Sequence, residues 1–367
     1  MNFLIYGAHL DYHTDSVAWV LRQNGHHVDV WYQGNFPNQQ QISIYFSSKD
    51  QYKNKNWAIE DFSVKIKNSV EYDLIWYRRP STAILADYVH AADKEMATKE
   101  ANSLMQGMDY LLKSDAHWVN SPENNKKASN KVLQLDTAVR CGLTIPNTLV
   151  SNCPNKIRDF VASCNTAIYK PFFQAGWLKE RIGKSIVTTK IYLSLLSNDK
   201  SLAACPGIFQ EFIEKDFEVR LTIMGNTWKA VKIGNYKNDA SAIDWRTWAN
   251  TDAISYSTID LPNFIIEKCL KLTAILQIRF ACIDLICGKD GNYYFLEANP
   301  GGQFLWLESA VPETRMLETF CNFLLDEVGA STSVRPVSML DYDVACEGKQ
   351  TVLPHTLVKN SFAYSDV

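Results

Sequence analysis

The feature that most constrains this chain of 367 residues is a pair of apolar segments whose neighbouring ends carry acidic and amide side chains. Segments 280–287 and 292–298 are typical of strands, and the Gly-Lys-Asp-Gly sequence at 288–291 has the chemistry of a hairpin turn. Alternation along a strand places residues two apart on one face. The hairpin therefore predicts that three oxygen-bearing side chains converge at one end of a sheet. They are Asp284, Glu297 and Asn299.

Oxygen ligands of this kind suit Mg²⁺, which prefers to share its coordination with phosphates. The Pro-Gly-Gly turn at 300–302 would let the backbone come close to a ligand. A polar strand end followed by a turn is the alternative explanation of the same residues. A metal site is favoured only if the chain also supplies cations for phosphate groups.

Candidate phosphate-binding cations occur at two positions before this hairpin. Lys170 ends a predicted strand, and Lys131 lies on the first turns of a predicted helix. Each lysine alone is also explained as a solvated surface charge. The two lysines are therefore candidates that depend on the rest of the site.

Segment 210–225 is more specific, because an apolar strand is followed by a kink around 214–216 and a second strand. A purine could pair with backbone N–H and C=O groups along the edge of such a connector. Glu218 and Arg220 lie on one face of the second strand. A carboxylate suits ribose hydroxyls, and a guanidinium suits phosphoryl oxygens. An amphipathic hairpin with a charged face remains the alternative interpretation.

Composition excludes several classes of protein. The net charge of −3 gives no basic field for nucleic acid. The N-terminal apolar run lacks the flanks of a signal peptide, and no window reaches the ~18 apolar residues of a membrane span. The nine cysteines form no Cys-x-x-Cys pair. We therefore expect free, mostly buried thiols and a cytoplasmic location.

The first part of the chain alternates predicted strands and helices. Strands are expected at 2–6, 27–32 and 73–77, and helices at 15–23 and 88–113. This order predicts an α/β layer. No Gly-x-Gly-x-x-Gly follows the first strand, which disfavours a dinucleotide site.

The rest of the chain is predicted to have mixed α+β structure. A helix at 127–140 should end at Gly142, a glycine C-cap, and a second helix is expected at 263–277. The pattern of 331–367 is too weak to assign. Further strands are predicted at 166–170, 186–192, 207–213, 217–224 and 228–233.

Five motifs follow one another along the chain: WYRRP (76–80), SNKVLQLDTAVRCGLTIPNTLVSN (129–152), QEFIEKDFEVRLTIMGN (210–226), DWR (244–246) and ACIDLI…YFLEANPGGQFLWLE (281–308). In this order they resemble the ATP-grasp carboxylate–amine/thiol/hydroxyl ligases, and most of all the macrocyclising peptide ligases of microviridin-type graspetides. The resemblance implies an ATP-grasp fold, of mixed α/β and α+β class, in which a pre-ATP-grasp α/β domain spans 1–115. A central lid would span 116–205, the C-terminal ATP-binding subdomain 206–330, and an unassigned extension 331–367.

The resemblance also implies ATP and Mg²⁺ as cofactors and assigns roles to residues. Arg220 and Arg246 would face the transferred phosphoryl group, and segment 179–190 would cover the triphosphate. The implied Mg²⁺ ligands are Asp284, Glu297 and Asn299. The implied ATP ligands are Lys131, Lys170, Gln210, Glu211, Phe212, Ile213 and Glu218.

The function implied by the resemblance is the maturation of a ribosomal precursor peptide (RiPP) with a leader and an acidic, hydroxyl-containing core. Asp or Glu side chains would be activated as acyl phosphates and joined to Thr or Ser hydroxyls or Lys amines, giving macrocyclic esters or amides. A homodimer is expected from the family alone. Two alternatives remain: a ligase that adds an amino acid to a peptide or protein terminus, and a nucleotide-binding module without catalysis.

Three further groups of residues have open or structural interpretations. His9 and His13, with nearby aspartates, could imitate a metal site but are expected to be surface histidines. The arginines of Arg78-Arg79 could contact substrate carboxylates or pair with acidic neighbours. Phe304 and Trp306 could pack in the core or form a wall facing the substrate.

Overall fold

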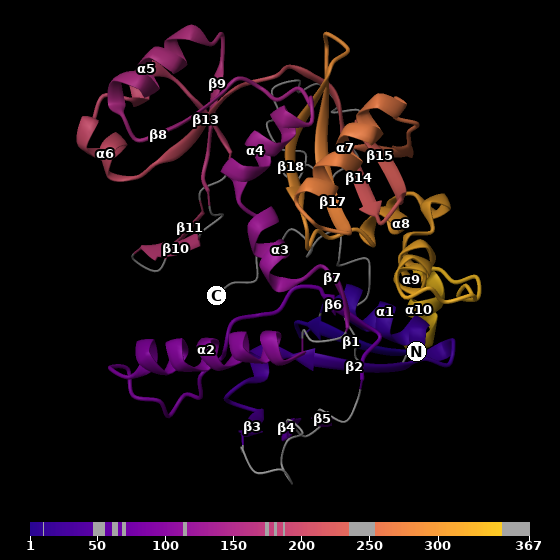
Figure 1. The fold of residues 1–367 in the computed structure, drawn as a ribbon. Coiled ribbons are helices and arrows are strands. Elements are labelled where there is room, and N and C mark those ends of the chain that lie inside the picture. The colour runs from indigo at the N-terminus through magenta and orange to yellow at the C-terminus, as the bar shows by residue number, and fades with distance from the viewer. Residues whose placement is uncertain are drawn as a thin grey trace.

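The structure is a computed structural model that describes residues 1–9, 11–46, 56–60, 65–67, 71–112, 116–172, 176–179, 182–185, 188–234 and 254–346. Three sheets organise the described part of the chain (Figure 1). A parallel sheet lies at the N-terminus, and two antiparallel sheets follow it in sequence.

The N-terminal sheet has the strand order β2-β1-β6-β7, with all pairs parallel. Its central strand β1 is buried on both faces, which explains the unbroken apolar run at 3–6. The three predicted strands and both predicted helices of this region are present, but the second helix begins at 94 and not at 88, and strand β7 was not predicted. Its elements are β1 (Asn2–Gly7), α1 (Tyr12–Gln23), β2 (His27–Tyr32), a 3₁₀ turn (Gln33–Asn35), β6 (Leu74–Tyr77), α2 (Lys94–Leu112) and β7 (His117–Val119).

A small antiparallel sheet adjoins this layer and was not predicted. Its order is β3-β4-β5. Ile59 and Ile66 from this sheet are buried against Tyr6 and Trp31 of the parallel sheet. The strands are β3 (Gln41–Tyr45), β4 (Asn56–Glu60) and β5 (Lys65–Lys67).

The helix expected at 127–140 is two helices, α3 (Pro122–Ala128) and α4 (Lys131–Arg140). The break occurs because the Asn130 side chain caps α4, accepting a hydrogen bond from Leu133 N at 3.0 Å. Gly142 ends the helix in the left-handed region, as predicted, with φ +78°. Gln134 joins α4 to the C-terminal sheet through two hydrogen bonds with the backbone of Ala298, at 2.7 and 2.9 Å.

The middle sheet has the order β12-β9-β13-β8 and packs against α5. Its core includes Ile157, Ala167 and Phe209. A separate hairpin, β10 (Gly176–Lys179) with β11 (Ile182–Ser185), follows β9. The remaining elements are β8 (Thr148–Ser151), α5 (Pro154–Ser163), β9 (Ala167–Lys170), β12 (Thr189–Ile191), a 3₁₀ turn (Leu193–Leu195), α6 (Asp199–Ala204) and β13 (Gly207–Glu211).

The C-terminal sheet has the order β16-β15-β14-β17-β18. Every residue of β17 is buried, with the α7 core on one face and the C-terminal helices on the other. The predicted hairpin is confirmed, and its Gly291 has φ +78°. The elements are β14 (Lys215–Met224), β15 (Thr227–Gly234), β16 (Ser255–Thr258), α7 (Asn263–Ile275), β17 (Phe280–Gly288) and β18 (Tyr293–Asn299).

The chain then returns to the N-terminal layer through α8 (Trp306–Ala310), a 3₁₀ turn (Pro312–Thr314), α9 (Met316–Glu327) and α10 (Met339–Cys346). Helices α9 and α10 pack on α1. The buried Glu308 carboxylate accepts hydrogen bonds from Leu317 N at 2.9 Å and Met339 N at 2.7 Å. Part of the unassigned extension is therefore a docked helix at 339–346, reached through the non-helical segment 331–338, and only 347–367 lie outside the described residues.

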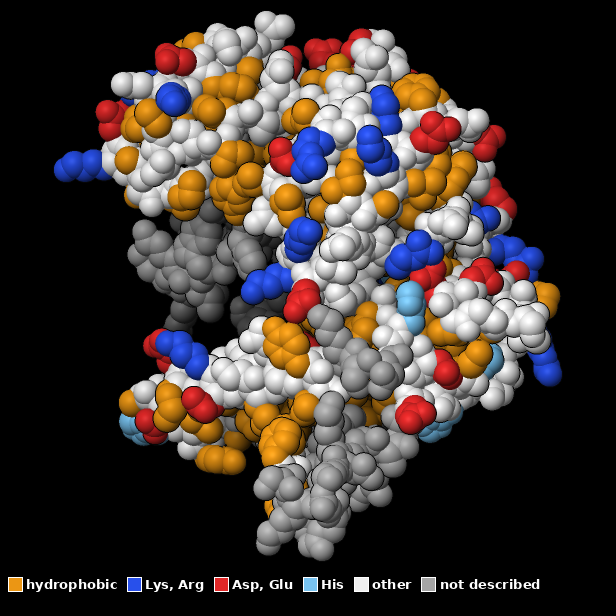
Figure 2. Space-filling model, viewed as in Figure 1, with side chains coloured by type: hydrophobic (Ala, Val, Ile, Leu, Met, Phe, Trp, Pro, Cys, Tyr) orange, Lys and Arg blue, Asp and Glu red, His pale blue; other side chains and the backbone are white. Residues whose placement is uncertain are grey.

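Two expectations from composition can be compared with the structure. No helix in the described part of the chain is long and apolar enough to cross a membrane. The nine cysteines are free thiols; five are buried, whereas Cys153 and Cys205 are exposed. Figure 2 shows acidic and basic side chains interspersed on the viewed face, in keeping with the small net charge of −3.

Candidate active site

A cleft that is open to solvent lies between the middle sheet and the C-terminal sheet. Its lining comes from α4, β9, β13, the connector after β13, β14, β17 and β18. The structure brings nine of the predicted site residues into this lining. They are Lys131, Lys170, Gln210, Glu211, Phe212, Ile213, Glu218, Asp284 and Glu297.

Two of the carboxylates in the cleft stand directly opposite each other across neighbouring strands. Asp284 of β17 is in register with Glu297 of β18, and with Arg220 of β14 on its other side. Arg220 Nη1 donates to Asp284 Oδ1 at 2.7 Å. Asn299 lies on the same face as Glu297, as predicted, and its amide donates to Glu297 Oε1 at 3.1 Å. One row across three strands thus carries a cation and two carboxylates.

Like charges directly opposite on neighbouring strands repel, so this arrangement needs positive charge near both carboxylates. Arg220 supplies it for Asp284. Among the described residues no group of three or more His, Cys, Asp and Glu side chains could hold a metal. Two carboxylates and an amide nevertheless fit Mg²⁺, which typically binds one or two protein carboxylates and completes its shell with water and phosphate oxygens.

Arg220 connects the carboxylate row to the loop that follows β18. Arg220 is 5% exposed, and its Nη2 donates to the carbonyl of Gln303 at 3.0 Å. These contacts hold the Arg220 guanidinium beside Asp284 whether or not a ligand is bound. Arg246, the second predicted arginine, lies outside the described residues.

The connector after β13 forms one wall of the cleft. The N–H groups of Glu211 and Phe212 donate to Asn147 O and Thr166 O, each at 2.9 Å. These two N–H groups already donate to backbone carbonyls of the protein. A bound purine base would therefore have to pair with other backbone groups of the connector. Gln210 is buried, and its Nε2 donates to Thr148 Oγ1 at 2.9 Å.

Sequence reasoning missed Lys215, which lines the cleft and is 6% exposed. Its ammonium donates to Glu218 Oε1 at 2.5 Å, a buried ion pair. Strict alternation would place residues three apart on opposite faces of β14. A β-bulge between Lys215 and Phe217 brings the pair together. The missed apolar wall consists of Ile168, Ile286 and Leu296, with Pro146, Pro171 and Thr188 beside it.

The two predicted phosphate lysines approach the cleft from different elements. Lys131 begins α4, and its Nζ donates to the carbonyl of Pro171 at 3.0 Å. Lys170 ends β9. Both lie in the cleft lining. The side chains of the segment predicted to cover the triphosphate are outside the described residues from 179 to 187.

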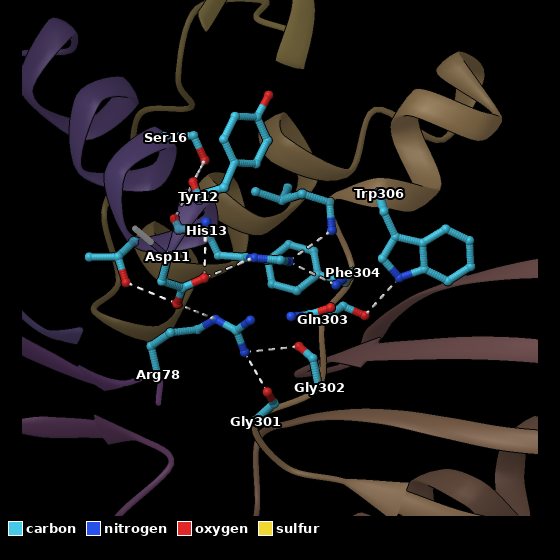
Figure 3. Close-up of polar contacts among 12 residues, drawn as sticks. Asp11, Tyr12, His13, Ser16, Arg78, Gly301, Gly302, Gln303, Phe304 and Trp306 are labelled. Atoms are coloured by element: carbon cyan, nitrogen blue, oxygen red, sulfur yellow. Dashed lines mark hydrogen bonds and ion pairs between the residues drawn. The ribbon is translucent and has the colours of Figure 1, made fainter. Parts of the chain in front are cut away.

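A buried polar network joins the N-terminal layer to the loop after β18 (Figure 3). His13 Nε2 accepts hydrogen bonds from Phe304 N at 3.0 Å and Leu305 N at 3.1 Å. Asp11 accepts from His13 Nδ1 at 3.2 Å and pairs with Arg78 Nε at 3.2 Å. The network therefore attaches the end of β6 and the start of α1 to the loop that continues from Asn299.

Arg78 completes this network on its other side. Its Nη1 donates to the carbonyls of Gly301 and Gly302, the latter at 3.0 Å. The structural interpretation of Arg78, pairing with an acidic neighbour, is confirmed. Phe304 is fully buried, as expected for a core residue, while Trp306 is half-buried and donates to Gln303 O at 3.3 Å.

The expectation that both histidines lie on the surface is wrong for His13. His9 is exposed and stacks on Tyr32. His13 is buried because its ring receives two backbone N–H groups from a segment almost 300 residues away, a contact that no local pattern reveals.

The Pro-Gly-Gly turn packs more tightly against the protein than the sequence suggested. A Cβ at Gly301 would lie 2.9 Å from the backbone carbonyl of Arg78. A Cβ at Gly302 would lie 2.5 Å from Cys282 Cβ. The close approach that requires glycine is therefore an approach between segments of this chain.

Burial and Arg78 lower the pKa of His13 to about 4, from an ordinary value of 6.5. Because the folded protein resists protonation of this ring, the free energy of unfolding should fall as the pH drops below 6.5, by about 2 kcal/mol at pH 5. Urea titrations at pH 7 and pH 5 measure this difference in the free energy of unfolding. His13→Gln should show a smaller difference between these two pH values, and an identical difference in both proteins would contradict the assignment.

Comparison with known proteins yields structural matches only. No family model matches this chain, and no curated protein matches its sequence. A RiPP-associated ATP-grasp ligase from Chryseobacterium gregarium, solved with ADP and a leader and core peptide, superposes with a TM-score of 0.79 at 24% identity, covering 92% of this chain and 99% of that one. The macrocyclase MdnC of Microcystis aeruginosa, bound with precursor peptide MdnA, superposes with a TM-score of 0.77 at 25% identity, covering 89% of this chain and 100% of that one.

A third match is the ATP-grasp ligase PsnB, complexed with minimal precursor, Mg and ADP. Its TM-score is 0.66 at 21% identity, covering 89% of this chain and 97% of that one. The chain therefore has the ATP-grasp fold, as its motifs indicated.

Proposed function

We propose that this chain is an ATP-dependent ligase that forms macrocyclic ester or amide links within a ribosomal precursor peptide. The observation that supports it most is the row of Arg220, Asp284 and Glu297 across three strands of a cleft that also holds two predicted phosphate lysines. The fold is shared with ligases whose structures contain ADP, Mg or precursor peptides.

In this proposal the nucleotide lies along the cleft. Lys131 and Lys170 bind its phosphates, and Glu218 binds the ribose. The connector from Gln210 to Ile213 holds the adenine. Mg²⁺ would be held by Asp284, Glu297 and Asn299, and when bound it would supply positive charge to the phosphoryl oxygens.

The reaction has two steps that conserve atoms. A carboxylate oxygen of the peptide forms a bond to the γ-phosphorus of ATP, and ADP leaves. A hydroxyl or amine of the same peptide then attacks the acyl carbon, loses its proton, and expels inorganic phosphate. Such a transfer needs alignment and neutralised charge more than a nucleophilic side chain. Arg220, fixed beside Asp284, supplies part of that charge, and Arg246 is proposed for the same task.

Two alternatives share the nucleotide site. A ligase that adds an amino acid would increase the mass of the peptide, whereas ring closure removes one water for each link. A nucleotide-binding module without catalysis would bind ATP and leave both ATP and peptide unchanged. The free thiols are compatible with a reducing cytoplasm, and a homodimer remains a family-level expectation.

The test is incubation with ATP, Mg²⁺ and candidate peptides: MdnA, and synthetic peptides with Asp or Glu and Thr, Ser or Lys in their cores. We expect ADP release that depends on peptide, together with a mass loss of one water per link. Chelation of divalent cations should stop both. A mass gain equal to an amino acid would favour the first alternative, and ATP binding with unchanged peptide and nucleotide would favour the second.

A further inference from the structure

A second cavity lies in the N-terminal layer and shares no lining residue with the nucleotide cleft. Its volume is about 450 Å³, within the range of cavities that hold small groups. One wall is the face of α2 from Asn102 to Tyr110. The other walls follow the ends of three parallel strands: Gln33 after β2, Tyr77 to Thr82 at and after the end of β6, and Pro122 to Lys126 after β7.

This position is where open parallel sheets commonly bind ligands. In the order β2-β1-β6-β7 the chain passes from β1 to one neighbour, β2, and later returns to the other neighbour, β6. The loops at the carboxyl ends of such strands diverge and leave a crevice. The cavity is lined by α2 and by the loops after β2, β6 and β7, while the loop after β1 contributes no residue, so it lies at the carboxyl edge of the sheet beside this crevice.

The lining favours hydrogen-bond donors and disfavours anions. Asp109 places a carboxylate in the lining, and the cation among the lining residues, Lys126, is exposed. Among the described residues, Asn125 Oδ1 is buried without a hydrogen-bond partner, and so is Asp109 Oδ1, although the Tyr6 hydroxyl, itself unpaired, lies close to the Asp109 carboxyl. Both atoms are acceptors, and leaving buried acceptors unsatisfied destabilises a protein unless a ligand or water supplies a donor.

Asp109 is the most informative of these groups. Burial raises the pKa of its carboxyl to about 6, and contact with the Tyr6 hydroxyl offsets part of that rise. At neutral pH the group is still mostly ionised, so a half-buried anion faces the cavity. Apolar and aromatic surface from Met105, Tyr77 and Tyr110 surrounds it. This combination suits a side chain with an apolar stem and a donor at its tip.

The cavity is connected to the loop beside the proposed metal ligands. Tyr77 is followed by Arg78 and Arg79, and a Cβ at Gly301 would lie 2.9 Å from Arg78 O and 3.7 Å from Arg79 Cγ. On the other side, α3 supplies Asn125 to the cavity, while α4 begins with Lys131 in the nucleotide cleft. The two sites are thus separated by a few residues of backbone.

We propose that this cavity holds a peptide side chain ending in an ammonium or hydroxyl group, with Asp109 and Asn125 as its acceptors. That the ligand is a peptide rests on the proposed function. The donor preference and the location rest on the cavity itself.

Met105 provides a direct probe, because it lines the cavity and is one of seven methionines. The protein, labelled with ¹³C at its methionine methyl groups and without nucleotide, is titrated with N-acetyl-lysine, N-acetyl-threonine and N-acetyl-norleucine methylamides. Met105→Leu assigns the signal. We expect the Met105 signal to move with the lysine or threonine probe, the larger effect identifying the group, and to stay unchanged with norleucine.

Asp109→Asn should weaken binding of the responding probe by about tenfold, as loss of a charge-assisted hydrogen bond does. Gln106→Trp, which fills the cavity, should abolish it. Glu100→Gln removes a carboxylate from an exposed position of α2 outside the cavity lining and should change nothing. An unmoved Met105 signal, an equal response to norleucine, or wild-type affinity in Asp109→Asn would overturn the proposal. Turnover is not measured, so inactivity with ATP and peptides would refute the proposed ligase and leave this result standing.

Discussion

Glu297→Gln should reduce peptide-dependent ADP release by more than about 100-fold while leaving the fold intact. The change preserves the size of the side chain and its contact with the Asn299 amide, but removes a charge opposite Asp284. Groups that only orient a metal ligand typically contribute 10- to 100-fold to affinity or activity, and a ligand itself should contribute more. ADP release measured across a Mg²⁺ titration, together with the thermal midpoint, provides the test.

Glu297 is a better position for this experiment than Asp284. Asp284 pairs with the buried guanidinium of Arg220 at 2.7 Å. Removing that carboxylate would leave a buried charge unpaired, at a cost of about 3–5 kcal/mol, and would mix a folding defect with a chemical one. The matched control is Glu214→Gln on the connector, where an exposed pair with Lys289 contributes little. Wild-type turnover and wild-type Mg²⁺ dependence in Glu297→Gln would show that Glu297 is not a metal ligand.

The sequence predicted the C-terminal sheet well because its signals are local. Strand β17 is buried throughout, so its apolar run has no interruption, and the turn at 288–291 carries the glycine that its backbone requires. The alternation rule then sufficed to place Glu297 and Asn299 on one face. Cross-strand partners and hairpin turns are encoded within a few residues.

Features that depend on irregular backbone were missed. The single helix predicted at 127–140 ran from the end of α3 into α4, whereas a capping asparagine at 130 separates two helices. A bulge in β14 brings Lys215 to the same face as Glu218, against the period of an ideal strand. Both errors arise because one side chain or one extra residue overrides a periodic pattern.

Contacts between segments that are distant in the sequence could not be predicted either. Only Met339 and Tyr342 of helix α10 are buried, which is too few to give a recognisable helical period in the sequence. The helix is attached by a hydrogen bond of 2.7 Å that the Tyr12 hydroxyl donates to Asp343. His13 was placed on the surface for the same reason, since its partners follow β18. Burial of a polar side chain depends on partners that only the folded chain brings together.

Arg78→Ala should both destabilise the protein and impair turnover, since this residue supports the loop next to the proposed metal ligands. Arg78 is 1% exposed, and its guanidinium contacts Asp11 and the carbonyls of Gly301 and Gly302. Removing it leaves the Asp11 carboxylate without this cation, with an expected loss of about 3–5 kcal/mol in the free energy of unfolding. A loop displaced by about 1 Å at Asn299 could lower turnover by about 100-fold.

The experiment separates positioning from substrate contact by comparing neighbouring arginines. Arg79 is exposed and adjacent in sequence, so Arg79→Ala should keep wild-type stability, and any effect should appear in the KM for peptide. Arg78→Lys keeps a charge but cannot reproduce the forked contacts, so it should recover only part of the stability. Hydrogen exchange at 299–305 should accelerate in Arg78→Ala and remain unchanged in Arg79→Ala. Equal exchange and equal stability in both variants would show that the network does not hold this loop beside the proposed metal ligands.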